Sequence, residues 1–278
     1  MTRSSPQAPN RPFAALRVRV LTGVAYGAAL LGVVVFAGPL GFALLLSILG
    51  VLAVSEFFRL TRRERRPVPE FCGQAAVAAC PLAAAADGVF GIVTVLGVLV
   101  IAALTWHVAY GNLRTADTAV VVVGATYVGG SLAHLVLVRS LEDGVALVIA
   151  VLASVWAGDI AAYFAGSTIG TRRLAPRISP HKTWEGFVAG AAATVGVWVA
   201  VPAISGVALD AWWLAIIGAC VAVSALIGDL FESRVKREAG VKDSGGLLPG
   251  HGGMLDRIDS LIPASIVAYH LLAAGPMS

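Results

Sequence analysis

The sequence predicts an all-α, polytopic integral membrane protein with about nine transmembrane helices and a cytoplasmic N-terminus. Hydrophobic residues make up 58% of the 278 positions. Only 13% are charged, against roughly 25% in soluble domains. The apolar residues also occur in long blocks rather than in amphipathic periods, which is typical of helices that cross a bilayer. Three cysteines lie inside apolar segments without a CxxC spacing and indicate no metal motif.

A polar tail at 1–19 precedes the apolar segments, most of which approach the roughly 20 residues that a spanning helix needs. We expect 20–140 to form the N-terminal helices and 141–278 to carry the chemistry, as parts of one membrane-embedded unit. The third and the last segments are short for a span. In order, the segments are 20–37, 39–58, 72–86, 90–109, 119–138, 144–168, 184–204, 207–228 and 261–275.

The distribution of basic residues supports this topology. Nine alternating spans that start in the cytoplasm place 19 of the 20 Lys and Arg residues on the cytoplasmic side, with Arg139 outside. Two polar loops, 169–183 and 229–260, lie on the same side. Nucleotides and phosphorylated metabolites are available there, so we expect a site that faces the cytoplasm from the plasma membrane.

The stretch 228–260 concentrates six acidic and five basic residues between two apolar segments. Asp229 ends the eighth segment, while Asp256 and Asp259 precede the ninth and share one face of a helical turn. A carboxylate at a membrane boundary is costly unless it is hydrated, paired or bound to a metal. Oxygen ligands without cysteine favour a hard cation such as Mg²⁺. The alternative is ion pairing at the interface with Arg234, Arg237 and Arg257.

Basic residues and glycines flank these acids. Lys236, Arg237 and Lys242 can contact phosphates, or they can anchor the helix at anionic lipid headgroups. The run Gly250-His251-Gly252-Gly253 can expose successive backbone N–H groups to a phosphate, although the P-loop spacing is absent. His251 is open to several roles, among them acid–base chemistry and phosphate contact.

A second polar cluster, Ser179 to Gly186, stands at the entry to the seventh segment. Lys182 can reach a phosphate from a second direction, and Ser179 or Thr183 can cap the helix that follows. Asp159 lies inside the sixth segment, where an ionisable residue is either functional or hydrogen-bonded to a neighbouring helix. Interhelical hydrogen bonding is the favoured interpretation for three other polar residues near segment ends, namely Glu56, His107 and His134.

The motif S-x-V-K-R-x4-K-D-x-G-x2-L-P-x-H-G-G-M-x-D-R-I-D, at 233–259, resembles the signature of the phosphatidate cytidylyltransferases, also called CDP-diacylglycerol synthases. GDLFES, SPxKTWEG, the segment 159–166 and EFFRL at 56–60 are similar to this family too. His181 departs from the Lys expected there. The resemblance implies a polytopic enzyme that joins CTP and phosphatidate, with Mg²⁺, to give CDP-diacylglycerol and pyrophosphate.

The resemblance also implies roles for individual residues. The metal ligands would be Asp229, Asp256 and Asp259, with a second cation left open. The catalytic residues would be Asp229 and Asp256 together with four basic residues that contact the phosphates, namely Lys182, Lys236, Arg237 and Lys242. The further substrate-binding residues would be Ser179, Gly250, His251, Gly252, Gly253, Arg257 and Asp159. The expected partners are CTP, phosphatidate and membrane lipids, with no nucleic acid and with a homodimer left open.

Three other functions compete with this hypothesis. A related enzyme could act on another lipid phosphate or a phosphorylated polyprenol, and apolar lipid contacts do not separate the two. An ion-coupled transporter could use Asp159 and Asp229, but it predicts paired half-repeats that the sequence lacks. A scaffold descended from an enzyme is disfavoured because every charged position of the motif is present.

Overall fold

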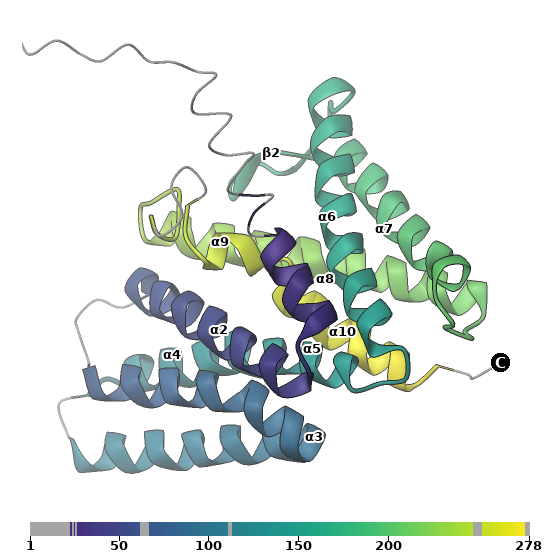
Figure 1. Cartoon of the computed structure of the whole chain (residues 1–278). Helices are drawn as coiled ribbons and strands as arrows, with labels where there is room; N and C mark the ends of the chain where they lie inside the picture. Colours follow the sequence, from purple (N-terminus) through teal and green to yellow (C-terminus); the bar gives the residue numbers. More distant parts are fainter. Residues whose placement is uncertain are drawn as a thin grey trace, which may run out of the picture.

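The chain folds into a helical membrane protein, seen here in a computed structural model that describes residues 23, 25, 27–61, 67–110, 113–246 and 252–275 (Figure 1). A helical stretch, Gly27–Phe36, comes first. The elements that follow are α2 (Pro39–Thr61), α3 (Pro67–Ala109), α4 (Thr115–Ala125), the π-helical turn η1 (Thr126–Gly130), α5 (Ser131–Arg139), α6 (Gly144–Thr168), β1 (Arg173–Ala175), β2 (Ser179–Thr183), α7 (Trp184–Ile204), α8 (Ala211–Glu238), α9 (Leu255–Ile258) and α10 (Leu261–Ala273).

Six helices of the described residues are long and apolar enough to cross a membrane, which confirms the predicted all-α membrane class. They are Pro39–Thr61, Pro69–Ala109, Thr115–Arg139, Gly144–Thr168, Trp184–Ile204 and Ala211–Glu238. The described part of the first predicted span is shorter than these, and so is α10 with 13 residues. The total of nine spans and the side of the N-terminus therefore remain predictions.

The third and fourth predicted segments are both helical within α3. The backbone leaves helical geometry at Asp87 and at Gly88, whose φ of 61° lies in the left-handed region. Figure 1 shows the two arms of α3 folded back on each other at this point. A single continuous span of 43 residues would be about twice the length that a bilayer needs, so the break restores two helices of ordinary length.

A short β-hairpin joins α6 to α7, and the all-α prediction missed it. Strands β1 and β2 are antiparallel, with Arg173 opposite Thr183 and Ala175 opposite Ser179. Of the two residues proposed as helix caps, Thr183 takes the role, because its Oγ1 accepts a hydrogen bond of 3.1 Å from the Gly186 N–H. Ser179 instead begins β2. The hairpin thus sets Lys182 two residues before the start of α7 at Trp184, next to the capping Thr183.

The helices of the C-terminal half pack against one another largely in chain order. Helix α6 packs on α7, α7 on α8, and α8 on α10, which also contacts α5. Thr194 of α7 donates a hydrogen bond of 3.1 Å to the Ser154 carbonyl of α6, and both residues are buried. This packing brings the last turns of α6, the hairpin and the second half of α8 to one end of the helical bundle.

Candidate active site

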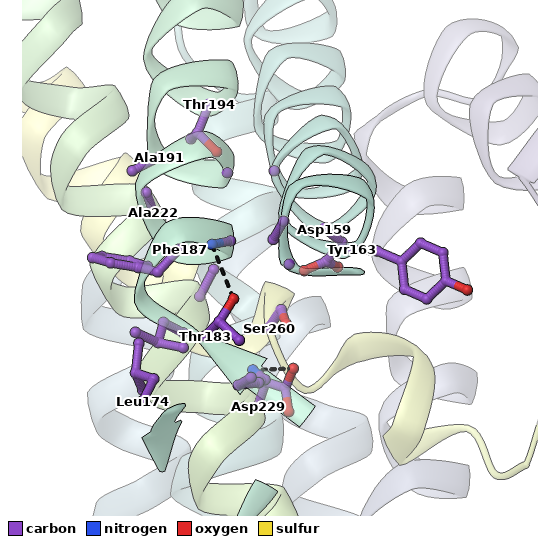
Figure 2. A pocket seen from close by; sticks show the side chains of 18 of the residues that line it. Asp159, Tyr163, Leu174, Thr183, Phe187, Ala191, Thr194, Ala222, Asp229 and Ser260 are labelled. Carbon is purple, nitrogen blue, oxygen red and sulfur yellow. Dashed lines mark hydrogen bonds and ion pairs between the residues drawn. The ribbon is translucent and has the colours of Figure 1, made fainter. Parts of the chain in front are cut away.

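A cavity of about 640 Å³ opens between α6, the hairpin, α7 and α8 (Figure 2). Figure 2 shows Thr194, Ala191 and Ala222 toward one end of it and Asp229 at the other, with Asp159 and Ser260 between them. Small and apolar side chains cover most of the remaining wall, while Asp159, Arg173, Lys182 and Asp229 supply charge. A cavity of this size, apolar with a few convergent polar groups, is the usual form of a small-molecule site.

We define a cavity cluster of four charged residues at the polar end: Asp159, Lys182 and Asp229, which line the cavity, and Asp259, which lies next to them outside the lining. Lys182 Nζ forms an ion pair with Asp229 Oδ2, and the two side chains are 25% and 28% exposed. Ser233 Oγ donates a hydrogen bond of 3.2 Å to the other oxygen of Asp229. Asp259 lies close enough to both Asp159 and Asp229 to interact with them electrostatically. The cluster therefore gathers three carboxylates around one ammonium group.

The residue before Asp229 allows two backbone segments to meet here. A Cβ at Gly228 would lie 2.3 Å from the Asp259 carbonyl oxygen, so only glycine fits this position of α8. The close approach brings the end of the eighth helix against the turn that follows α9. Asp229 and Asp259, thirty residues apart in the chain, come together for this reason.

A second group, the loop cluster, consists of Glu56, Glu232, Lys236, Ser244 and Asp256. Lys236 Nζ pairs with Glu232, and it also donates a hydrogen bond of 2.6 Å to Asp256 Oδ1. The other oxygen of Asp256 accepts bonds from the Gly253 N–H at 2.7 Å and the Ser244 N–H at 2.9 Å. Asp256 is thus held by donors on both oxygens.

The end of α8 explains how Ser244 reaches Asp256. Gly240, with φ of 72°, follows the C-cap, and its N–H bonds the Arg237 carbonyl at 3.1 Å. The Val241 N–H bonds the Lys236 carbonyl at 3.0 Å. These two bonds form a Schellman motif, which ends the helix and turns the chain back along it. Residues 241–246 then run toward the segment that contains Asp256.

Burial and hydrogen bonding act in opposite directions on Asp256 and Asp259. Burial disfavours the charge of Asp256, but its hydrogen bonds with Glu232, Lys236 and two backbone N–H groups lower its pKa to about 2. Burial, followed by the charge of Asp229, raises the pKa of Asp259 to about 7. A hydrogen bond from the Ser260 N–H offsets this only in part. Asp256 is therefore ionised at neutral pH, whereas the pKa of Asp259 lies close to neutral pH.

The structure brings some of the predicted site residues together and leaves others apart. Asp159, Lys182 and Asp229 line the cavity, and Lys236 and Asp256 are paired beside it. Arg237, Lys242 and Arg257 are exposed, and Arg237 donates to the Val241 carbonyl at 3.2 Å. Among the described residues, neither these three nor Ser179 line the cavity. Gly252 and Gly253 lie beside Asp256, while Gly250 and His251 fall outside the described residues.

The sequence left open that the acids pair with nearby arginines, but Asp229 and Asp256 pair with lysines instead. Arg234 pairs with Glu238 at 2.6 Å, Asp229 pairs with Lys182, and Asp256 pairs with Lys236. Sequence reasoning also treated Glu56 as an interhelical residue, whereas it contacts the loop that carries Asp256. The sequence offered one indication of a role for Glu56, its position in the EFFRL segment that is similar to the family.

The fit of a metal ion can be tested against these contacts. Within the described ranges, no three Asp, Glu, His or Cys side chains lie close enough together to hold a metal ion. Asp256 would have to give up or share an existing donor to become a ligand, and so would Asp229, whose two oxygens contact Lys182 and Ser233. Asp229 and Asp259 repel each other, and a cation would relieve that repulsion. Such a pair fits Mg²⁺, which commonly uses one or two carboxylates and completes its shell with substrate phosphates.

These features define a membrane-embedded protein whose charged site closes one end of an apolar cavity. The chain belongs to the cytidylyltransferase family, whose sequence profile matches residues 17–274. This confirms the family that the motifs indicated.

Individual relatives agree with this assignment. The chain is similar to the phosphatidate cytidylyltransferase of Bacillus subtilis, with 32% identity over 266 residues that cover 93% of this chain and 98% of the relative. The enzyme of the same name from Mycobacterium bovis is 29% identical over 284 residues, covering 94% and 89%. The one from Brucella suis biovar 1 is 45% identical over 147 residues. That match covers 52% of this chain and 54% of the relative, so the chain spans about half the length of the Brucella protein.

Proposed function

We propose that the protein transfers a cytidylyl group from CTP to phosphatidate and releases CDP-diacylglycerol and pyrophosphate. The observation that carries this proposal is the cavity, whose wall is largely apolar and whose end holds Asp159, Lys182 and Asp229. A lipid phosphate needs both environments, one for its acyl chains and one for its headgroup. The names of the aligned relatives from Bacillus subtilis and Mycobacterium bovis support the same reaction.

The reaction joins two anions, so it needs positioning and charge neutralisation more than a covalent nucleophile. An oxygen of the phosphatidate phosphate forms a bond to the α-phosphorus of CTP. The bond from that phosphorus to the oxygen bridging toward the β-phosphorus breaks, and pyrophosphate leaves with the electron pair. Lys182, which lines the cavity and pairs with Asp229, would neutralise phosphate charge there. Lys236, which donates a hydrogen bond to Asp256, would be a second source of positive charge for the phosphates.

We propose Mg²⁺ as the cofactor, held first by Asp229 and Asp259, with Asp256 as the third predicted ligand. When bound, the ion would neutralise the developing charge on the phosphate oxygens and align them. Asp256 also has a role independent of the ion, because its charge holds Lys236 in place. A second cation and a homodimer are further predictions.

The site is proposed to face the cytoplasm from the plasma membrane. The excess of basic residues on one side of the predicted spans supports this orientation. CTP would then arrive from water while the acyl chains of phosphatidate stay in lipid. Cysteine accessibility in intact cells tests the orientation: Arg177→Cys, in the exposed hairpin turn, should react with a permeant maleimide only.

The function is tested with the purified protein in detergent micelles, supplied with labelled CTP, Mg²⁺ and one lipid phosphate at a time. We expect CDP-diacylglycerol from phosphatidate, release of pyrophosphate, and little product from polyprenyl phosphate. Product from a polyprenyl phosphate alone would instead identify a related lipid transferase. No turnover with any lipid phosphate would refute the proposed chemistry.

A further inference from the structure

Glu56 connects the N-terminal half of the molecule to the loop that carries Asp256. It lies on α2 and is 2% exposed, which is rare for a carboxylate that lacks strong partners. Its Oε2 accepts a hydrogen bond of 2.7 Å from Ser244 Oγ and one of 2.9 Å from the Leu255 N–H. These partners stand 188 and 199 residues further along the chain. One carboxylate therefore joins the segment after α8 to the residue just before Asp256.

The loop backbone packs directly against this carboxylate. A Cβ at Gly253 would lie 2.2 Å from Glu56 Oε2, and one at Gly245 would lie 2.6 Å from Oε1. The Gly253 N–H is itself one of the donors to Asp256. The position of Glu56 thus sets the positions of the two backbone groups that hold Asp256 Oδ2.

The Ser244 hydroxyl indicates how the two carboxylates share donors. Ser244 Oγ lies 2.7 Å from Glu56 Oε2 and 3.0 Å from Asp256 Oδ2, but it has a single proton to donate. Asp256 already accepts from two backbone N–H groups and from Lys236. The shorter contact and the smaller number of other donors assign the proton to Glu56. Glu56 then fixes Ser244, and the Ser244 N–H fixes Asp256.

We infer that Glu56 is a positioning residue for the transfer reaction, which it serves by orienting Asp256 and, through it, Lys236. This inference rests on the proposed function. Glu56 does not line the cavity, so its effect must pass through the loop. The expected signature is a loss in kcat with little change in KM, since the groups that contact substrate are all kept.

The test compares Glu56→Ala and Glu56→Gln with Ser47→Ala. Ser47 lies on the same helix, is buried, and donates to the Ala78 carbonyl of α3 at 2.7 Å, so its loss removes a buried interhelical bond away from the loop. We expect Glu56→Ala to lower kcat about 10²-fold and to change KM for CTP less than about threefold. Glu56→Gln keeps an acceptor for Leu255 and should lose about tenfold or less. Ser47→Ala should keep kcat within about twofold.

A second measurement separates positioning from a general effect on the fold. In an Asp256→Asn background, Glu56→Ala should lower the remaining rate by less than about threefold, because both changes act on one group. A further 10²-fold loss would overturn the inference, as would a Glu56→Ala protein with unchanged kcat. Failure of both Glu56 variants to fold would assign the residue to the fold alone and overturn it as well. An inactive wild-type protein would instead refute the proposed function.

Discussion

Replacing Lys182 by Met removes the ammonium group that pairs with Asp229 and keeps the length of the side chain. The incoming phosphates would then meet Asp159 and Asp229 in the cavity wall, with the charge of Asp259 close enough to interact with both. A unit charge about 4 Å away contributes about 4 kcal/mol at an effective dielectric constant of about 20, and about 1 kcal/mol in bulk water. The two side chains are about one quarter exposed, so a value of about 2–3 kcal/mol is appropriate.

This free energy corresponds to a loss of about 10²-fold in kcat/KM. The assay is the initial rate of CDP-diacylglycerol formation by purified variants at several CTP concentrations. Lys182→Arg keeps the charge but not the shape of the group, and should recover part of the loss. The matched control is Arg177→Met, which removes a charge from the exposed turn of the same hairpin. We expect this variant to remain within about twofold of the wild type.

Two outcomes would refute the reasoning. The first is a Lys182→Met protein that keeps kcat/KM within about threefold of the wild type. The second is an equal loss in Arg177→Met, which would mean that the rate follows the overall charge of the hairpin rather than the group that faces the cavity. Thermal unfolding of each variant in detergent checks that the comparison is made between folded proteins.

Three further predictions concern the loop and the acidic residues. Asp256→Asn should lower kcat more than about 10²-fold, because Lys236 loses the charge that holds it; normal activity would contradict this assignment. Gly253→Ala would place a Cβ 2.1 Å from Ser244 Oγ and should inactivate the protein, whereas Gly196→Ala, which meets nothing within 4 Å, should not. A carboxyl at Asp259 with a pKa of about 7 loses its proton as the pH rises. If it binds Mg²⁺, affinity measured by titration calorimetry should therefore rise about tenfold between about pH 6 and pH 8, and Asp259→Asn should remove this dependence.

The hydropathy of the sequence was sufficient to predict the helices. Long apolar blocks have few alternatives to a helix in a membrane, because every backbone polar group must be paired within the segment. The hairpin β1–β2 was missed because its strands, RLA and SPHKT, have only three and five residues and give no apolar period to detect. The break at Asp87 and Gly88 was anticipated as a boundary between two segments, because it interrupts a continuous apolar run with a charge and a glycine.

The site was predicted less completely than the fold. Lys182 and Asp229 stood out by their position at span ends, and they pair as neighbours in one cavity. Arg237 and Lys242 looked equivalent to Lys236 in sequence, but only Lys236 pairs with Glu232 and Asp256. Arg237 follows Lys236 on α8, where the helical rotation separates adjacent residues by about 100°, and it is exposed. Lys242 is exposed beyond the end of this helix. The contacts of Glu56 span almost 200 residues of chain, so they follow from the tertiary packing of α2 and from no local pattern.

The two clusters share helix α8, and this sharing explains their division of charge. Asp229, Glu232 and Lys236 occupy positions three and four apart, so they lie along one face of the helix. Lys236 is taken by Glu232 and Asp256, which leaves Lys182 as the ammonium group paired within the cavity cluster. That cluster by itself carries more negative than positive charge and disfavours a bare phosphate, although Arg173 also lines the cavity and Arg257 interacts electrostatically with Asp159. A site with this balance suits substrates that arrive with a cation, since the carboxylates that repel a bare phosphate attract its metal complex.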